Sequence, residues 1–334
     1  MATNSELGTA AHAQSSPARE AGFAIVVVLA VLSLLALVAI VLQKSTAVDI
    51  RATAYLASHA RAEALADGLT RLAIRHLVVN APSGEKSGPF RLDGTALTCR
   101  SGASAATISF INTDGLININ LAPQVLMERA FGGVGLGEAQ ATRLAKDIID
   151  FRSGGDLSID GGSKLGIYQQ AGLRHGPKDA PFQSVGELEQ VVGMTPALLE
   201  QLRPLLTVYS RFGVVNPSVV SMPVALALSG GSASQSLETL QSRLILPDEF
   251  TYIQRSRSLT STNSNTFVVR VAVDGGGNTR FTREAVVELT GARFDGAAIK
   301  EWTELDHEHN GLDRSAAGDA SSCVGGLLLF EPNP

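Results

Sequence analysis

One apolar run limits what this chain can fold into more than any other feature. Phe23 to Leu42 holds twenty residues without a charge, and Ser33 is its only polar side chain. As an α-helix rising 1.5 Å per residue it spans about 30 Å, the thickness of a bilayer's hydrocarbon core. The next stretch, Gln43 to Ile74, has no proline and a single glycine, and its apolar residues recur at helical spacing. We therefore predict one long helix that begins inside a membrane and continues outside it.

Three interpretations compete for this run. A secretory signal peptide normally has only 7–15 apolar residues and a small-residue cleavage site after them, which is not the pattern here. A plain membrane anchor fits any run of this length and composition. A type IV pilin-like N-terminus also fits, because that family cuts a leader after a glycine placed directly before an apolar helix, and Gly22 and Phe23 stand at that junction. The residues alone favour the anchor and the pilin-like interpretation and leave the signal peptide as the third alternative.

Length, charge and cysteine content narrow the class of protein. A chain of 334 residues has room for one large or two modest domains. Its net charge of −5 argues against a protein built to hold a polyanion. The two cysteines, Cys99 and Cys323, form a disulfide if they lie outside the cytoplasm, and otherwise remain two thiols. No spacing motif decides between these, and no Cys or His stands near Cys99 to suggest a metal site.

The predicted secondary structure of the remaining chain changes twice. The pattern indicates short strands up to about residue 112, short helices from Asp114 to Asn216, and then strands again. The later strands are predicted at residues 250–254, 267–273 and 282–289, the last two joined by a glycine-rich hairpin turn. A Gly–apolar–apolar–Asn pattern occurs at both ends of the helical part, starting at Gly115 and at Gly213. We interpret these two sites as the seams where a helical insert leaves and rejoins a sheet.

Two local patterns in the helical part suggest binding. Asp150, Asp156 and Asp160 share one glycine-rich turn, and carboxylate oxygens are the ligands that calcium prefers. Their spacing does not fit an EF-hand loop, so a solvated acidic loop remains the alternative to a calcium site. No other cofactor is indicated.

A helix–turn–helix pattern follows, with a capping box at Ser184 and Glu187 and a second helix starting at Thr195–Pro196. Such hairpins bind DNA backbones in other proteins, which gives the alternative function of a membrane-anchored helix-hairpin-helix nucleic-acid-binding protein. The turn carries no Lys or Arg, however, and Arg203 is the nearest base, so packing is favoured and no nucleic acid is expected.

No catalytic set is evident in the sequence. The histidines at positions 59, 76, 307 and 309 have no nucleophile or ligand partner at a useful spacing, so we expect a non-enzymatic protein.

Taken together, these segments resemble the protein K family of type II secretion minor pseudopilins over about residues 17–303. The matching segments are Gly22–Phe23, Asp114 to Pro123, Asp147 to Arg152, Tyr168, Phe182 to Leu188, Val192 to Pro196, Tyr209–Ser210 and Val215 to Pro217. This family usually has an acid-rich run after the Arg152 position, where this chain has Ser153-Gly-Gly.

The resemblance implies an α+β, type IV pilin-like fold: a long N-terminal helix packed on a small antiparallel sheet, with a large inserted all-α domain. The implied segments are a leader (1–22), the transmembrane and amphipathic helix (23–78), the pilin-like domain (79–112 and 218–305), the inserted helical domain (113–217) and a C-terminal tail (306–334).

The implied function is a structural minor pseudopilin at the tip of the type II secretion pseudopilus, needed for export of folded proteins across the outer membrane. Its partners would be other minor pseudopilins of the tip complex, the major pseudopilin, and a prepilin peptidase that cuts and N-methylates the chain. The chain would cross the bacterial inner membrane once, with its globular part in the periplasm. Val27, the fifth residue after the junction, stands where most of the pilin superfamily has Glu, and the resemblance makes it a determinant of the tip position.

Overall fold

The computed structural model describes residues 18–80, 91–101, 104–229, 265–275, 279–290 and 296–305. The chain divides into two compact units, Met1–Ala57 and Ser58–Pro334, which we treat separately. The strand predicted at residues 250–254 and the C-terminal tail lie outside the described residues, as does most of the predicted leader.

The predicted long helix is present as α1 (Ala18–Asn80), 63 residues without a break. It begins five residues before the expected start at Phe23, because Ala18, Arg19, Glu20 and Ala21 are all good helix formers.

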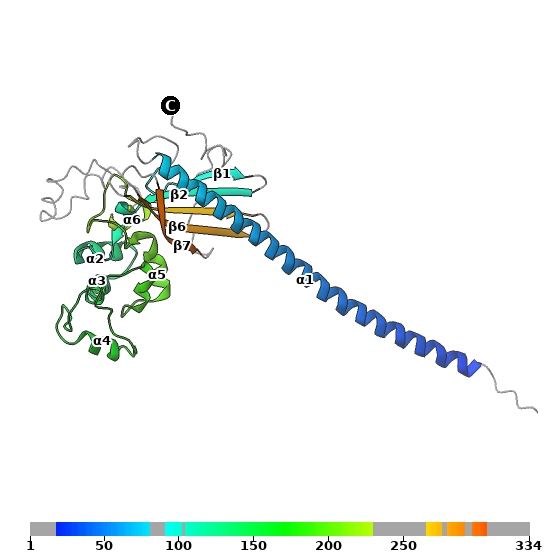
Figure 1. Cartoon of the computed structure of the whole chain (residues 1–334). Coiled ribbons are helices and arrows are strands. Elements are labelled where there is room, and N and C mark those ends of the chain that lie inside the picture. The colour runs from blue at the N-terminus through cyan, green and yellow to red at the C-terminus, as the bar shows by residue number, and fades with distance from the viewer. Residues whose placement is uncertain are drawn as a thin grey trace, which may run out of the picture. The chain divides into compact units, whose positions relative to one another are not determined.

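A five-stranded antiparallel sheet forms the centre of the second unit, in the order β1-β2-β5-β6-β7 (Figure 1). Its strands are β1 (Leu97–Ser101), β2 (Ser104–Asn112), β5 (Thr266–Asp274), β6 (Arg280–Thr290) and β7 (Gly296–Glu304). The strands predicted at residues 267–273 and 282–289 are confirmed, and β2 agrees with the short strands expected up to about residue 112. Leu92 lies in a bend beside a single bridge between Asp93 and Ile111.

The C-terminal part of α1 packs on one face of this sheet (Figure 1). Its buried apolar residues follow one stripe of the helix, and half of them are alanines: Ala62, Ala66, Leu69, Ala73, Ile74 and Leu77. The small alanine side chains let the helix axis approach the strands closely. The buried aromatic side chains of this core come from the sheet: Phe110, Phe267 and Phe281.

A buried arginine crosses this apolar interface. Arg283 of β6 is 7% exposed, and its Nε lies 2.7 Å from Oδ1 of Asp67 on α1. Its second contact on α1 is Glu63, at 3.3 Å. The guanidinium also lies over the rings of Phe281 and Trp302, at 4.8 and 5.4 Å from their centroids. Two carboxylates and two ring faces thus compensate the cost of removing this charge from water.

Short helices pack against the opposite face of the sheet. They are α2 (Gln124–Gly133), α3 (Glu138–Arg152), α4 (Lys164–Gln170), α5 (Pro196–Leu202) and α6 (Met222–Leu228), with the 3-10 turns η2 (Thr113–Gly115), η3 (Val185–Gln190) and η4 (Arg203–Leu205). Their apolar side chains form one core that also includes Ile111, Val268 and Val286 of the sheet. The central strands are therefore covered on both faces.

The two predicted seams meet in space. β3 (Ile117–Asn118) pairs in parallel with β4 (Leu206–Thr207), and the backbone nitrogen of Asn216 donates to the oxygen of Asp114 at 2.7 Å. A Cβ atom at Gly115 would lie 2.0 Å from the backbone oxygen of Val219, and one at Gly213 would lie 2.5 Å from that of Leu121. Both glycines are therefore required by close backbone contacts, which explains the repeated pattern.

The predicted helix–turn–helix is confirmed only in its second helix. The first segment is the 3-10 turn η3, and the Ser184 side chain makes no capping hydrogen bond, so the predicted capping box is wrong. The second helix, α5, starts as predicted, because the Thr195 hydroxyl accepts from the nitrogen of Leu198 and Pro196 occupies the first turn.

Replacing Arg283 with Met should lower the free energy of unfolding of the full-length chain in detergent by about 1–3 kcal/mol, because the variant loses charge-assisted bonds at a buried position. Urea titration followed by circular dichroism measures the change. Arg91→Met is the control, since Arg91 forms an ion pair with Asp93 while its side chain is 68% exposed, and it should change stability by less than about 0.5 kcal/mol. Equal losses in both variants would contradict a special role for Arg283.

Candidate functional site

The apolar segment of α1 is the first candidate. Phe23–Ile40 is helical, long and apolar enough to cross a membrane, and wholly exposed within the structure. Phe23 is 73% exposed and Val27 is 44% exposed. Gly22 and Phe23 both lie inside α1, so the predicted processing junction is a helical peptide bond.

The three predicted calcium ligands do not lie together. Asp150, which is 6% exposed, accepts from the Ser158 hydroxyl at 2.5 Å and from the nitrogen of Ile159 at 3.0 Å. Asp160 forms an ion pair with Lys146 at 2.5 Å, and the side chain of Asp156 is exposed. Among the described residues, no group of three or more His, Cys, Asp or Glu side chains is arranged to hold a metal ion. The calcium site stays a prediction.

A buried lysine that the sequence analysis missed organises this acidic loop. Lys164 is 3% exposed, and its ammonium donates to the backbone oxygens of Asp150 at 2.7 Å and Ser153 at 2.6 Å. Its third partner is Asp179, at 3.1 Å. Three donors thus meet three acceptors, which satisfies the ammonium completely. Periodicity gives no sign of this role, because a lysine after a glycine-rich turn normally points to solvent.

Arg152 performs a similar task at the end of α3. Its guanidinium donates to the backbone oxygens of Ile119 and Ala122, which lie between β3 and α2. Burial lowers the pKa of this guanidinium below its usual value. The Asp150 and Arg152 positions of the Asp147 to Arg152 motif therefore hold loops in place, and their roles are in the structure of the helical region.

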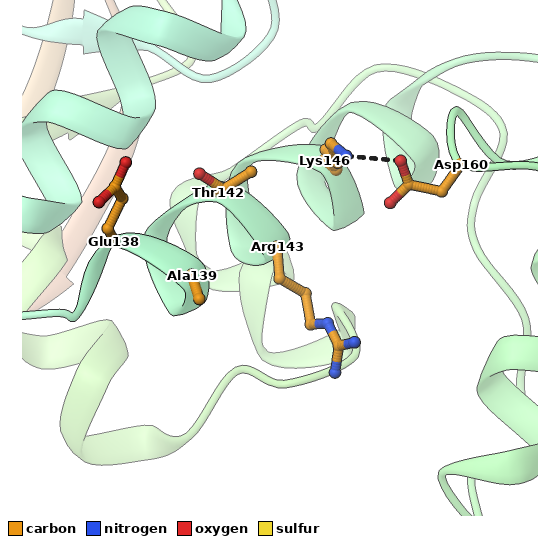
Figure 2. Close-up of a pocket in the computed structure, with 6 residues that line it drawn as sticks. All are labelled: Glu138, Ala139, Thr142, Arg143, Lys146 and Asp160. Atoms are coloured by element: carbon orange, nitrogen blue, oxygen red, sulfur yellow. Dashed lines mark hydrogen bonds and ion pairs between the residues drawn. The ribbon is translucent and has the colours of Figure 1, made fainter.

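A surface cavity of about 460 Å³ opens along α3, lined by Glu138, Ala139, Thr142, Arg143, Lys146 and Asp160 (Figure 2). The Lys146–Asp160 ion pair lies at one end of the lining, while Arg143 extends away from that pair. The lining contains two acidic and two basic side chains, and no nucleophile paired with a base. This arrangement supports no reaction class.

Asp147 is the most perturbed carboxyl group of the region. Burial raises the pKa of Asp147 to about 6, and the neighbouring carboxylates of Asp150 and Asp160 add to the rise, while Arg143 and Lys146 oppose it. The group therefore titrates nearer to neutral pH than an ordinary aspartate.

The histidines and the hairpin show no catalytic or nucleic-acid-binding arrangement among the described residues. His59 lies 3.8 Å from Glu304, and His76 is buried with its ring 6.2 Å from that of Phe110. His307 and His309 lie outside the described residues. In the hairpin, Arg203 forms an ion pair with Glu200 at 3.1 Å.

Asp147→Asn should stabilise the chain at pH 7 by about 1–2 kcal/mol, because it removes a charge from a partly buried site. The pKa of Asp147 is raised in the folded state to about 6 from 3.8. As the pH falls from about 6 to about 4, the folded wild type takes up this proton before the unfolded chain does, so its free energy of unfolding rises. The stability advantage of the variant should therefore vanish near pH 4. Melting temperatures measured in chelator between pH 4 and 8 test this.

The exposed carboxylate of Glu189 supplies the control, and Glu189→Gln should follow the wild-type pH profile. A constant advantage of Asp147→Asn at every pH would contradict the prediction. Replacing the chelator with millimolar calcium tests the predicted metal site, because a ligand that binds the folded state raises the melting temperature.

Comparison with known proteins agrees with the resemblance in the sequence. Residues 108–211 match the family model described as type II secretion system (T2SS), protein K. No curated protein sequence matches the chain. Among solved structures, a chain of the GspK-GspI-GspJ complex from the enterotoxigenic Escherichia coli type 2 secretion system is similar, with 13% sequence identity, a TM-score of 0.49, and coverage of 78% of this chain and 99% of that one. The family match confirms the resemblance to protein K of the type II secretion system over residues 108–211.

Proposed function

We propose that this chain is a structural minor pseudopilin of a type II secretion system, placed at the tip of the pseudopilus and needed for export of folded proteins. The observation that carries the proposal is the protein K domain at residues 108–211, present in a chain whose helix α1 contains an exposed apolar segment of membrane-spanning length.

The fold of the second unit supports a pilin-like assignment. The C-terminal part of α1 packs on an antiparallel sheet, and the described elements between β2 and β5, up to residue 229, are mostly helices. In this proposal the sheet and α1 form the pilin-like domain, and residues 113–217 form the inserted helical domain. The paired seams at β3 and β4 support the insertion, because the chain enters and leaves the helical region at one place.

The proposed location is the bacterial inner membrane, with the globular unit in the periplasm. The exposed segment Phe23–Ile40 would be the membrane-spanning part. The proposed partners are other minor pseudopilins of the tip complex, the major pseudopilin, and the prepilin peptidase that removes the leader and methylates Phe23.

The tip position is proposed from the apolar side chain at Val27. A carboxylate in the middle of an apolar helix costs several kcal/mol in hydrocarbon unless it has a partner. In a fibre, such a partner is supplied by the subunit already in place, and the first subunit has none. Val27 removes this cost, so the chain is suited to be the first subunit of the fibre. The helical region would then lie at the tip of the fibre.

The mature N-terminus tests the processing step. Mass spectrometry of the chain from its native host should find Phe23 as the N-terminal residue, carrying an N-methyl group. Gly22→Leu should leave the leader attached, while Ala21→Ser, one residue earlier, should be processed normally. An intact wild-type N-terminus, or a cut beyond Leu42, would refute the pilin-like assignment.

Labelling of assembled fibres tests the tip position. Antibody-gold directed at the helical region should mark one end of each pseudopilus in electron micrographs. Val27→Glu should reduce the number of labelled fibres, because the carboxylate has no partner in the first subunit. Val27→Ala, which keeps the position apolar, should behave as the wild type. Label repeated along the shaft would exclude the tip assignment.

A further inference from the structure

The acidic loop between α3 and α4, residues 153–163, is ordered with very little apolar burial. None of its side chains is buried, and Leu157 and Ile159 are 73% and 51% exposed. The loop folds back on itself through backbone hydrogen bonds, such as the one from the nitrogen of Ser158 to the oxygen of Gly162 at 3.0 Å. Hydrophobic packing therefore does not hold this loop against the rest of the helical region, and its attachment depends on polar contacts.

The strongest of these contacts converge on one buried ammonium group. Lys164, which is 3% exposed, follows the loop directly, and its ammonium donates to the backbone oxygens of Asp150 and Ser153 at 2.7 and 2.6 Å. The carboxylate of Asp179 lies 3.1 Å away on a third stretch of chain. Oxygens repel one another at such a short separation unless a positive charge lies among them. The cation is therefore a requirement of this arrangement.

The backbone around Asp179 takes an uncommon conformation where it presents this carboxylate. Asp179 has a φ of 54°, in the left-handed region that residues other than glycine seldom adopt. Its nitrogen donates to the oxygen of Phe151 at 2.9 Å, which fixes the residue beside the end of α3. The site of the ammonium is thus built from both sides of the loop.

From these observations we infer that the ammonium of Lys164 is the cation that orders the acidic loop, in the role that a bound metal ion has in other glycine- and aspartate-rich loops. The lysine belongs to the chain, so its charge is present whenever the chain folds. A calcium ion at Asp150, Asp156 and Asp160 is then not needed for the order of the loop. This inference does not depend on the proposed role in secretion.

Hydrogen exchange on the full-length wild-type chain in detergent tests whether the loop needs a metal. In chelator, the hydrogen-bonded amides of Ser158, Ile159 and Gly161 should exchange at least about tenfold more slowly than those of an unstructured peptide of the same sequence. Millimolar calcium should change these rates by less than about twofold, because the cation of the loop is already in place. Exchange at the unstructured rate in chelator would overturn the inference, whether or not calcium then slows it.

A pair of lysine variants tests which ammonium acts. Lys164→Met should make the loop amides exchange at least about tenfold faster in chelator, because three charge-assisted hydrogen bonds are lost, while β5 and β6 remain protected. Lys146→Met is the control, since it removes an ion pair with Asp160 in which the lysine side chain is 26% exposed, and it should change exchange of the loop by less than about threefold. Loop exchange in Lys164→Met no faster than in Lys146→Met would contradict the inference.

Chemical rescue separates the charge of the lysine from its bulk. Lys164→Ala lacks three carbons and the ammonium, which propylammonium supplies as a free cation and propan-1-ol replaces without the charge. Propylammonium should slow exchange of the loop in this variant at least about threefold relative to the same concentration of propan-1-ol, because only the cation can donate to the three oxygens. Both additives should leave the wild type unchanged. Equal exchange of the variant in the two additives would show that the loop does not depend on a cation.

Discussion

The second unit depends on the packing of α1 on the sheet, and Arg283 fixes the position of the helix in that packing. The apolar contact has little directional preference, because alkyl side chains such as those of Ala62, Ala66 and Leu69 can pack on a sheet in more than one way. A buried guanidinium is less permissive, since its bonds to Asp67 and Glu63 exist in one arrangement only. Displacement of the helix would leave a charge without partners in a low-dielectric interface, which costs far more than a lost methyl contact. The ion pair thus contributes specificity more than net stability.

In the helical region, buried cations also fix the packing of segments, but there they bond to backbone oxygens in place of carboxylates. Lys164 joins the acidic loop to the end of α3, and Arg152 joins α3 to the segment after β3. The side-chain amide of Asn120 donates to the oxygen of Phe182 at 2.9 Å and accepts from its nitrogen at 2.8 Å, like a residue of a β-ladder. Long loops are held by single polar side chains because the short helices between them bury few residues each.

The sheet has different neighbours on its two faces. α1 packs on one face, and the core of the helical region reaches the other through Ile111, Val268 and Val286. Tyr209 adds a direct connection, because its hydroxyl donates to Glu301 of β7 at 2.7 Å. The helical region thus contacts the sheet both through this apolar core and through the Tyr209–Glu301 hydrogen bond.

The sequence by itself determined the features that arise within one stretch of chain. The apolar run determined a helix of membrane-spanning length, and alternation determined the strands at residues 267–273 and 282–289. The motifs from Asp114 to Tyr209 carried the resemblance that the family model matches over residues 108–211. Tertiary structure decided which polar groups meet. Arg283 and Asp67 are 216 positions apart, and nothing in either local pattern pairs them. In the acidic loop, residues that are close in sequence do not share partners. Asp150 bonds to Ser158, whereas Asp160 bonds to Lys146. Periodicity reports which face of an element a side chain occupies, whereas its partner is set by the packing of elements that are distant in the chain.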